Sequence, residues 1–200
     1  VFLWSLMYTI CTPDQLARLK KGLATTGKKV VMYHRDADGI PAVALLKRFY
    51  PGFESVPREG PKLENKFVKE LIRKKPALIV FLDLPVDEEW KKIAEMEKAL
   101  PDTPIMVIDH HQILKDMNSE QTLHINPKFH QDAYLPTGYL IYRLLEKLLL
   151  GRKELERLVW IAGVAVIGDH AYEECTDLLK ECAKLDLVDK DVQKSKLFLG

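Results

Sequence analysis

Two unbroken apolar runs, residues 77–82 and 104–108, constrain the fold of this chain more than any other feature. A strand with one face in water alternates apolar and polar residues, whereas a strand buried on both faces reads as a continuous apolar run. Segments with a helical spacing of apolar residues lie beside these runs, at 64–75 and 87–100. Strands that alternate with helices form βαβ units, whose strands run parallel. The sequence therefore predicts an α/β fold with a doubly wound, mainly parallel sheet flanked by helices.

Cap and turn residues divide the rest of the chain into elements. Thr12 followed by Pro13 is typical of a helix start, and prolines at 51 and 76 end two further helices. We expect five strands, at 29–33, 53–57, 77–82, 104–108 and 122–125. We expect helices at 13–23, 39–50, 64–75 and 87–100, and a helical C-terminal region near 137–150, 153–167 and 173–185.

The charges of the chain nearly cancel, with 30 basic and 29 acidic residues and a formal net charge of +1. Such a chain has no overall field that attracts nucleic acid, so metal ions or a confined basic patch would have to hold a polyanionic substrate. The three cysteines form no Cys-x-x-Cys pair, which argues against a structural zinc site or a disulfide framework. No apolar stretch, the opening 1–11 included, reaches the ~20 residues of a membrane span. We expect a cytoplasmic protein with reduced thiols and no membrane partner.

The first expected strand leads directly into His34-Arg-Asp36-Ala-Asp38-Gly39. Alternate side chains of an extended backbone point to one side, so His34, Asp36 and Asp38 can converge. Gly39 permits a tight turn into the next helix, whose free N–H groups could face a phosphate. Taken alone, these residues fit a solvated Asx turn equally well.

Asp83 and Asp169 each follow a further apolar run. Asp83 ends the strand at 77–82, at the carboxyl edge where open α/β sheets bind their ligands. An aspartate there can also cap the next helix, but Asp87 competes for that capping position. Asp169 follows the run 160–168 and could supply one more ligand, whereas His170 is typical of a helix end.

The most specific cluster is Asp109-His110-His111, directly after the strand at 104–108. Three successive ionisable residues beside a buried strand are costly unless they are paired or coordinated. Neighbouring side chains of an extended backbone point to opposite sides, so we expect one histidine to bind metal and the other to contact a substrate phosphate. Asp109 could orient an imidazole. A surface pair of histidines is the simpler alternative, and it agrees less well with the preceding apolar strand.

Carboxylates and imidazoles at several strand ends are together typical of a two-metal hydrolytic centre. Mixed ligation of this kind suits Mn²⁺ better than Mg²⁺, which prefers oxygen ligands and retained water. We therefore expect two divalent ions, with Mn²⁺ as the first choice and Mg²⁺ or Co²⁺ as alternatives.

Taken in order, these residues resemble the four signature motifs of the DHH phosphoesterase superfamily, and specifically its RecJ-like branch. The motifs stand here as His34-Arg-Asp36-Ala-Asp38-Gly, Asp83, Asp109-His110-His111 and Gly168-Asp169. Asn126-Pro127 and Pro136-Thr137-Gly138 are similar to the family's connection between its third and fourth motifs. The resemblance covers residues 29–172.

The resemblance implies a role for each residue of these motifs. His34 and Asp36 would hold one ion and Asp83 would bridge the two, while the other ion would be held by Asp38, His110 and Asp169. His111 would contact the scissile phosphate and Asp109 would support the histidines, which makes these two the candidate catalytic residues. Independently of the family, Arg35 is a candidate for substrate contact because it lies inside the first motif, although ordinary solvent exposure explains such a residue as well.

The resemblance also implies a division of the chain. Residues 29–172 would form the catalytic domain, after an N-terminal extension and helix at 1–28 and before a helical connector at 173–200. Family members usually carry a second, C-terminal domain with a glycine-rich motif that grips the substrate. The sequence contains no such motif, so we expect that domain to be missing from this chain, which is then either a fragment of a longer protein or binds its substrate in another way.

The activity implied by the resemblance is hydrolysis of phosphodiester bonds in single-stranded DNA or RNA, as by a RecJ-like exonuclease. Replication or repair proteins would be its partners. Two alternatives stay open. One is a phosphodiesterase for short oligonucleotides or other small substrates, which agrees with the near-neutral charge. The other is a non-catalytic replication scaffold, whose mark in a sequence would be the loss of ligand residues.

Overall fold

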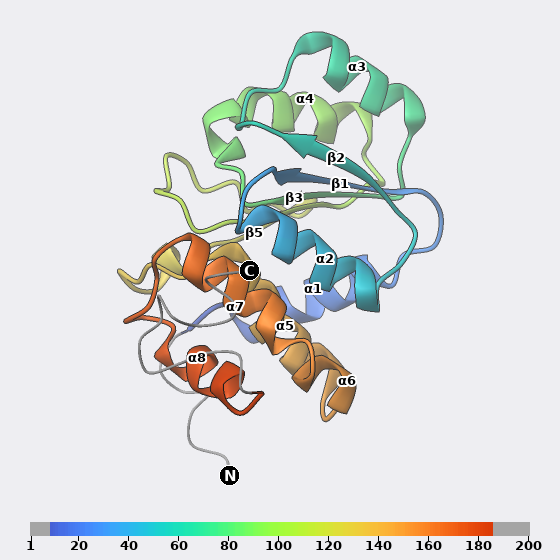
Figure 1. Ribbon diagram of the computed structural model, residues 1–200. Helices are drawn as coiled ribbons and strands as arrows, with labels where there is room; N and C mark the ends of the chain where they lie inside the picture. Colours follow the sequence, from blue (N-terminus) through green and yellow to red (C-terminus); the bar gives the residue numbers. More distant parts are fainter. Residues whose placement is uncertain (1–8, 186–200) are drawn as a thin grey trace.

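The computed structural model of the protein describes residues 9–185, which form one parallel sheet with helices on both faces (Figure 1). Residues 1–8 of the expected N-terminal extension and residues 186–200 of the expected helical connector lie outside the described residues. The five strands run in the spatial order β2-β1-β3-β4-β5, and every neighbouring pair is parallel. Their bounds are β1 Lys29–His34, β2 Phe53–Arg58, β3 Leu78–Leu82, β4 Ile105–Ile108 and β5 Thr122–Ile125. The predicted fold class is confirmed.

Helices cover the two faces unequally, as Figure 1 shows with α3 and α4 above the sheet and most other helices below it. The upper face packs against α3 (Asn65–Lys74) and α4 (Trp90–Ala99), which follows the short 3₁₀ helix η1 (Val86–Glu89). The larger lower core contains α1 (Pro13–Leu23), α2 (Gly39–Phe49), α5 (Thr137–Leu149), α6 (Lys153–Glu156), α7 (Val159–Gly168) and α8 (Thr176–Ala183). A second 3₁₀ helix, η2 (Pro127–Phe129), follows β5.

The apolar strands read as continuous runs because they are buried on both faces. In β3, Val80 and Leu82 enter the lower core, whereas Ile79 and Phe81 enter the upper one. All four side chains have no exposed surface. The alternation expected of a strand is therefore present, but both of its sides are apolar.

The strand order places a topological switch point at the carboxyl ends of β1 and β3. The chain leaves β1 toward α2 in the lower layer, and it leaves β3 toward α4 in the upper layer. Where two neighbouring strands send their connections to opposite faces, an open α/β sheet leaves room for a ligand at its carboxyl edge. The carboxyl ends of the strands point to the left in Figure 1.

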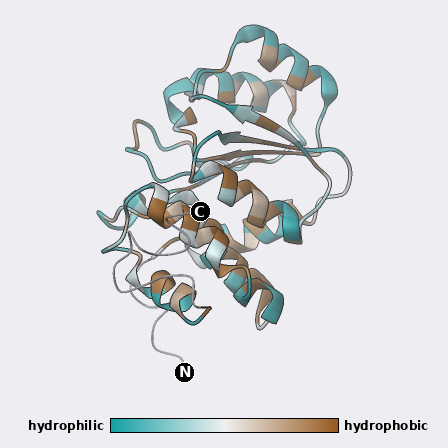
Figure 2. Ribbon diagram, viewed as in Figure 1, coloured by the Kyte–Doolittle hydropathy of each residue, from teal (hydrophilic) through white to brown (hydrophobic). Residues whose placement is uncertain are grey.

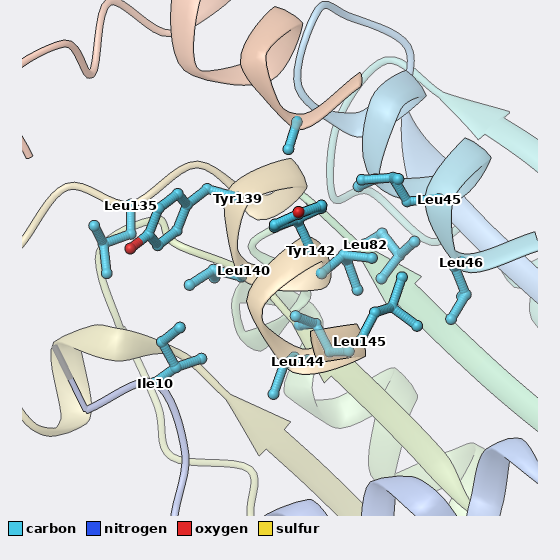
Figure 3. Packing of buried hydrophobic residues seen from close by; sticks show 14 of the residues in the cluster. Ile10, Leu45, Leu46, Leu82, Leu135, Tyr139, Leu140, Tyr142, Leu144 and Leu145 are labelled. Atoms are coloured by element: carbon cyan, nitrogen blue, oxygen red, sulfur yellow. The ribbon is translucent and has the colours of Figure 1, made fainter. Parts of the chain in front are cut away.

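Helix α5 packs against α2 and α7 in the lower core, in the same apolar cluster as Leu82 at the end of β3. Figure 3 shows Tyr142 and Leu145 of α5 beside Leu82 of β3, with Leu45 of α2 close by. Leu82 directly precedes Asp83, so apolar packing sets the position from which that carboxyl leaves the strand. Figure 2 shows the same division, with hydrophobic residues concentrated on the inward sides of the helices and hydrophilic ones outside.

The C-terminal helices differ from the prediction in one place. The single helix expected at 153–167 is two helices, α6 and α7, because the chain turns at Arg157 and Leu158 and the Leu158 N–H bonds to the carbonyl of Leu155. The turn lets Leu155 and Val159 both enter the core. In the described part of the chain, no helix is long and apolar enough to cross a membrane.

Gly168 lets the end of α7 approach the loop after β1. A Cβ atom at this position would lie 2.4 Å from the Cβ of Ala37. We expect Gly168→Ala to lower the free energy of unfolding by about 1–3 kcal/mol, because overpacking forces neighbouring backbone apart. Urea denaturation measures the effect. Gly60→Ala is the matched control, since a Cβ there would meet nothing within 4 Å; equal stability of the two variants would contradict the prediction.

Candidate metal centre

Four segments that are distant in the sequence meet at the carboxyl edge of the sheet. They are the loops after β1, β3 and β4, and the end of α7. The structure gathers their His and Asp side chains into three groups, and the candidate ligand atoms within each group lie within 4.8 Å of one another. The groups are His34, Asp36 and Asp83; Asp38, His110 and Asp169; and Asp83, His110 and His111. All six residues predicted as metal ligands are therefore in the cluster.

His110 lies at the centre of the cluster and is almost fully buried. Its Nε2 atom is 3.3 Å from Asp83 Oδ1, 3.4 Å from Asp169 Oδ2 and 3.6 Å from Asp38 Oδ2. A single imidazole nitrogen thus faces three carboxylates from three different segments. On the other side of Asp83, His34 Nδ1 lies 3.5 Å from Asp83 Oδ2 and 2.6 Å from Asp36 Oδ2.

The loop after β1 corrects the prediction of an extended backbone. Only His34 belongs to the strand, and the chain then turns, so that Asp36 and Asp38 enter different groups. The turn is an Asx turn, in which Asp36 Oδ1 accepts the amides of Asp38 at 3.0 Å and Gly39 at 2.9 Å. The Gly39 amide is consequently not free for a phosphate. Glycine is needed there because a Cβ would lie 2.2 Å from the carbonyl oxygen of His34.

Asp38 joins the loop after β1 to the start of α5. Its Oδ2 accepts the Thr137 amide and its Oδ1 accepts the Gly138 amide, both at 2.6 Å. The first amides of a helix have no partner within the helix and attract negative charge, so a fully buried carboxylate is well placed there. A Cβ at Gly138 would lie 2.5 Å from Ala165 and 3.2 Å from Asp38 Oδ1, which explains the glycine.

Asp83 has an unusual backbone conformation, with φ at +57°. Left-handed backbone is uncommon outside glycine, and non-glycine residues that adopt it are concentrated at functional sites. The conformation follows directly after the packed Leu82, and the carboxyl lies between His34 on one side and His110 on the other. Asp83 Oδ2 is buried and receives no hydrogen bond from any described residue.

The loop after β4 corrects a second expectation, because the two histidine side chains do not point to opposite sides. Their ring centroids are 4.6 Å apart. The reason is that the chain bends after β4: Asp109 Oδ2 accepts the His111 amide at 3.1 Å, and Asp109 Oδ1 lies 2.7 Å from His111 Nδ1. The Asn126 side chain holds the same bend by donating to the His111 carbonyl at 2.9 Å.

Asp87 does not cap a helix, contrary to the prediction. It is buried in η1, and its Oδ2 accepts the amides of Leu114 at 2.6 Å and Lys115 at 2.9 Å. The carboxylate therefore fixes the loop that carries the histidines. A capping position is inferred from sequence spacing alone, whereas this contact depends on how two loops meet in space.

Burial and mutual repulsion disfavour the charged form of two of these acids. Burial raises the pKa of Asp83 to about 8, and the charges of Asp36 and Asp109 act in the same direction. Burial and the nearby Asp83 carboxylate raise the pKa of Asp38 well above its ordinary value. A cluster of buried carboxylates with an unpartnered oxygen, surrounded by imidazole nitrogens, is a donor set that suits divalent cations. The residues therefore fit a two-metal centre.

His111 differs from the other histidines of the cluster. Burial alone would lower the pKa of its imidazole, but the hydrogen bond and negative charge of Asp109 outweigh burial and raise that pKa to about 9. The side chain is 41% exposed, so it lies at the solvent side of the centre. In the metal-free protein this pKa favours a positively charged His111 at neutral pH, at a position open to an anionic ligand.

Two residues near the motifs stand apart from the cluster. Arg35 is exposed and forms an ion pair with Glu59. His170 is exposed and its Nδ1 lies 3.0 Å from the hydroxyl of Tyr172, so it stays outside all three groups, as expected.

The sequence predicted no role for Tyr134, whose hydroxyl donates to Asp169, and none for the Thr137 and Gly138 amides. The Pro136-Thr137-Gly138 segment could have indicated the role of the two amides, whereas no sequence pattern points to Tyr134.

Comparison with protein families identifies the class of the protein. Residues 28–187 match the DHH family, N-terminal domain, and the chain therefore belongs to the DHH family of phosphoesterases. A search of curated proteins finds no significant match.

Several solved structures share the fold of this chain. An exonuclease RecJ bound to manganese has a TM-score of 0.68 at 21% identity, over 93% of this chain and 50% of its own. RecJ from Thermus thermophilus, in complex with Mn²⁺, has a TM-score of 0.60 at 20% identity, over 86% of this chain and 27% of its own. The DHH domain of a member of the s1p family of ribosomal proteins has a TM-score of 0.62 at 20% identity, over 90% and 48%. The chain thus spans half or less of the length of these proteins.

The crowded acids should lower the stability of the metal-free protein although they are needed to bind metal. A carboxyl whose pKa is raised by folding costs folding free energy that increases as the pH rises from its ordinary pKa toward the raised one. We expect Asp83→Asn to raise the Tm of the metal-free protein at pH 8 by at least about 3 °C, and to abolish the further increase caused by Mn²⁺. Calorimetry with and without Mn²⁺ measures both effects.

The gain in Tm from Asp83→Asn should shrink at pH 5, where the wild-type carboxyl is already protonated in the folded state. Asp102→Asn, a substitution of an exposed acid in a turn, is the matched control and should change neither quantity. A metal-free Asp83→Asn protein that is less stable than wild type at pH 8 would contradict the argument.

Proposed function

We propose that this protein is a metal-dependent phosphodiester hydrolase that acts on single-stranded DNA or RNA, with residues 29–172 as its catalytic domain. The observation that carries the proposal is that the group of His34, Asp36 and Asp83 lies next to the group of Asp38, His110 and Asp169, with Asp83 Oδ1 3.3 Å from His110 Nε2. One ion would be held by His34 and Asp36, and the other by Asp38, His110 and Asp169, with Asp83 shared. The mixture of carboxylates and imidazoles favours Mn²⁺.

The two ions, when bound, would supply an activated water and would neutralise charge on the phosphoryl group. The chain itself would contribute His111 at the open side of the centre. Asp109 lies 2.7 Å from its Nδ1 and favours the protonated ring, whose Nε2–H would donate to a phosphoryl oxygen on which charge develops. Asp109 acts in this scheme by orienting His111 and does not contact the substrate.

The nucleic-acid substrate is supported by the likeness to the RecJ exonucleases, which are larger proteins. Arg35 could contact a substrate strand by exchanging Glu59 for a phosphate. A second candidate is hydrolysis of short oligonucleotides or other small phosphoesters. This candidate is favoured because the basic residues near the first motif are paired with acids, which leaves them less available to the backbone of a long strand. Arg35, Arg48 and Arg58 each form an ion pair with a glutamate. A non-catalytic scaffold is disfavoured, since its mark would be lost ligand residues and every ligand position is filled.

Hydrolysis by the purified 200-residue chain distinguishes these functions. A 5′-labelled single strand, a dinucleotide and pyrophosphate are incubated in parallel with Mn²⁺ and with chelator. We expect Mn²⁺-dependent degradation of the long single strand. Cleavage of the dinucleotide alone would favour the second candidate, and Mn²⁺ binding without turnover of any substrate would contradict both.

Substitution of His110 tests whether the cluster is responsible for the activity. We expect His110→Ala to lower hydrolysis by more than about 10³-fold and to abolish binding of the Mn²⁺ assigned to Asp38, His110 and Asp169, because this imidazole faces three of the carboxylates. His130→Ala, which removes an exposed histidine outside the three groups, is the matched control. Full activity of the His110 variant would refute the assignment.

Substitution of His111 separates chemistry from metal binding. We expect His111→Gln to lower kcat by about 10²–10³-fold, because an amide cannot supply the positive charge of the imidazolium. Mn²⁺ binding, followed by calorimetry, should stay close to wild type. A loss of metal binding equal to that of His110→Ala would show that His111 acts as a ligand.

A further inference from the structure

We propose that Tyr134 is a positioning residue that sets the geometry of the ligand group formed by Asp38, His110 and Asp169. The inference rests on the proposed metal centre and adds a residue outside the family motifs. Tyr134 lies in the segment between η2 and α5, and its side chain reaches the centre from the solvent side.

Tyr134 contacts two members of this one group. Its hydroxyl donates to Asp169 Oδ2 at 3.1 Å, the same oxygen that lies 3.4 Å from His110 Nε2. Its ring packs edge-on against the His110 ring, with the centroids 4.9 Å apart and the planes at 68°. One side chain thus restrains both the carboxylate and the imidazole.

Backbone amides orient Asp36 and Asp38 but not Asp169, which gives Tyr134 its importance. Asp36 accepts two amides of its own turn, and Asp38 accepts two amides at the start of α5. Asp169 lies at the end of α7, where the chain turns away through His170 at φ +56°. The hydrogen bond that the described residues offer its carboxylate comes from the Tyr134 hydroxyl.

The segment that carries Tyr134 is itself fixed by packing. The flanking residues Ala133 and Leu135 are both buried in the lower core, whereas 41% of Tyr134 is exposed. Buried neighbours therefore fix the backbone on both sides of Tyr134, while its side chain stays partly exposed to solvent. A side chain placed in this way can orient a metal ligand without being needed for the stability of the fold.

The expected consequence is selective for one ion. Side chains that orient metal ligands commonly change metal affinity by about 10–100-fold when they are removed. We expect Tyr134→Phe to weaken the binding of one Mn²⁺ by about tenfold and to leave the second unchanged, because the hydroxyl bond and the ring contact of Tyr134 both go to members of one group. Tyr134→Leu also removes the ring contact with His110, and should weaken the same ion further.

Titration calorimetry of the full chain with Mn²⁺ measures both affinities, and electron paramagnetic resonance reports whether two ions are coupled. Tyr172→Phe is the matched control. It removes the hydroxyl of a nearby tyrosine that contacts His170 and the Ile167 carbonyl instead of the cluster. The Tm of the metal-free protein should be the same for wild type, Tyr134→Phe and Tyr172→Phe.

The outcomes separate this inference from the proposed function. Wild-type protein that binds no Mn²⁺ would overturn the metal centre itself. Wild-type protein that binds two ions, with both affinities unchanged in Tyr134→Phe, would overturn the role of Tyr134 alone. An equal loss at both sites, or a fall in the metal-free Tm, would show a general structural role and would also overturn the inference.

Discussion

The hydrogen bonds between the Asp38 carboxylate and the first amides of α5 connect the candidate centre to the core. Both distances are 2.6 Å, and the carboxylate is fully buried. Hydrogen bonds to a charged group contribute more than those between neutral groups, and a helix N-terminus adds the favourable end of its dipole. Because α5 is the central helix of the lower core, the packing seen in Figure 3 also fixes the position of this acid.

The same burial that fixes the acids makes them costly. Asp38 and Asp83 are buried beside each other and beside Asp169, so ionising all of them without a cation opposes folding. The left-handed backbone at Asp83 adds local strain. The apolar cores on both faces of the sheet offset these costs, which is how a stable fold can hold a site that is unfavourable by itself. Residues that lower the stability of the fold at the place they occupy are characteristic of functional sites.

Much of the fold was predictable from the sequence, because the apolar strands and helix ends are determined locally. The runs at 77–82 and 104–108 are buried strands within one residue of the predicted bounds, and Thr12 caps α1 as expected. The cluster was predictable because every strand of a parallel sheet delivers its following residues to the same edge. The directions of the side chains were not predictable, since they depend on turns. The Asx turn at Asp36 and the bend at Asp109 replaced the extended backbone from which the predictions were made. Asp87 and Tyr134 act across space on loops that no local pattern connects to them.

The candidate ligands are distributed over most of the described chain, from the end of β1 to the end of α7. This spacing has a consequence for folding. Closing such long loops carries its entropic cost before any ion can gain its full set of ligands, so a metal cannot act as a nucleus around which the chain collapses. The sheet and α5 have to be in place first. An ion bound at this edge would therefore slow unfolding of the folded domain more than it would speed folding. The domain would gain this resistance to unfolding only in the last step of folding, when the ion binds.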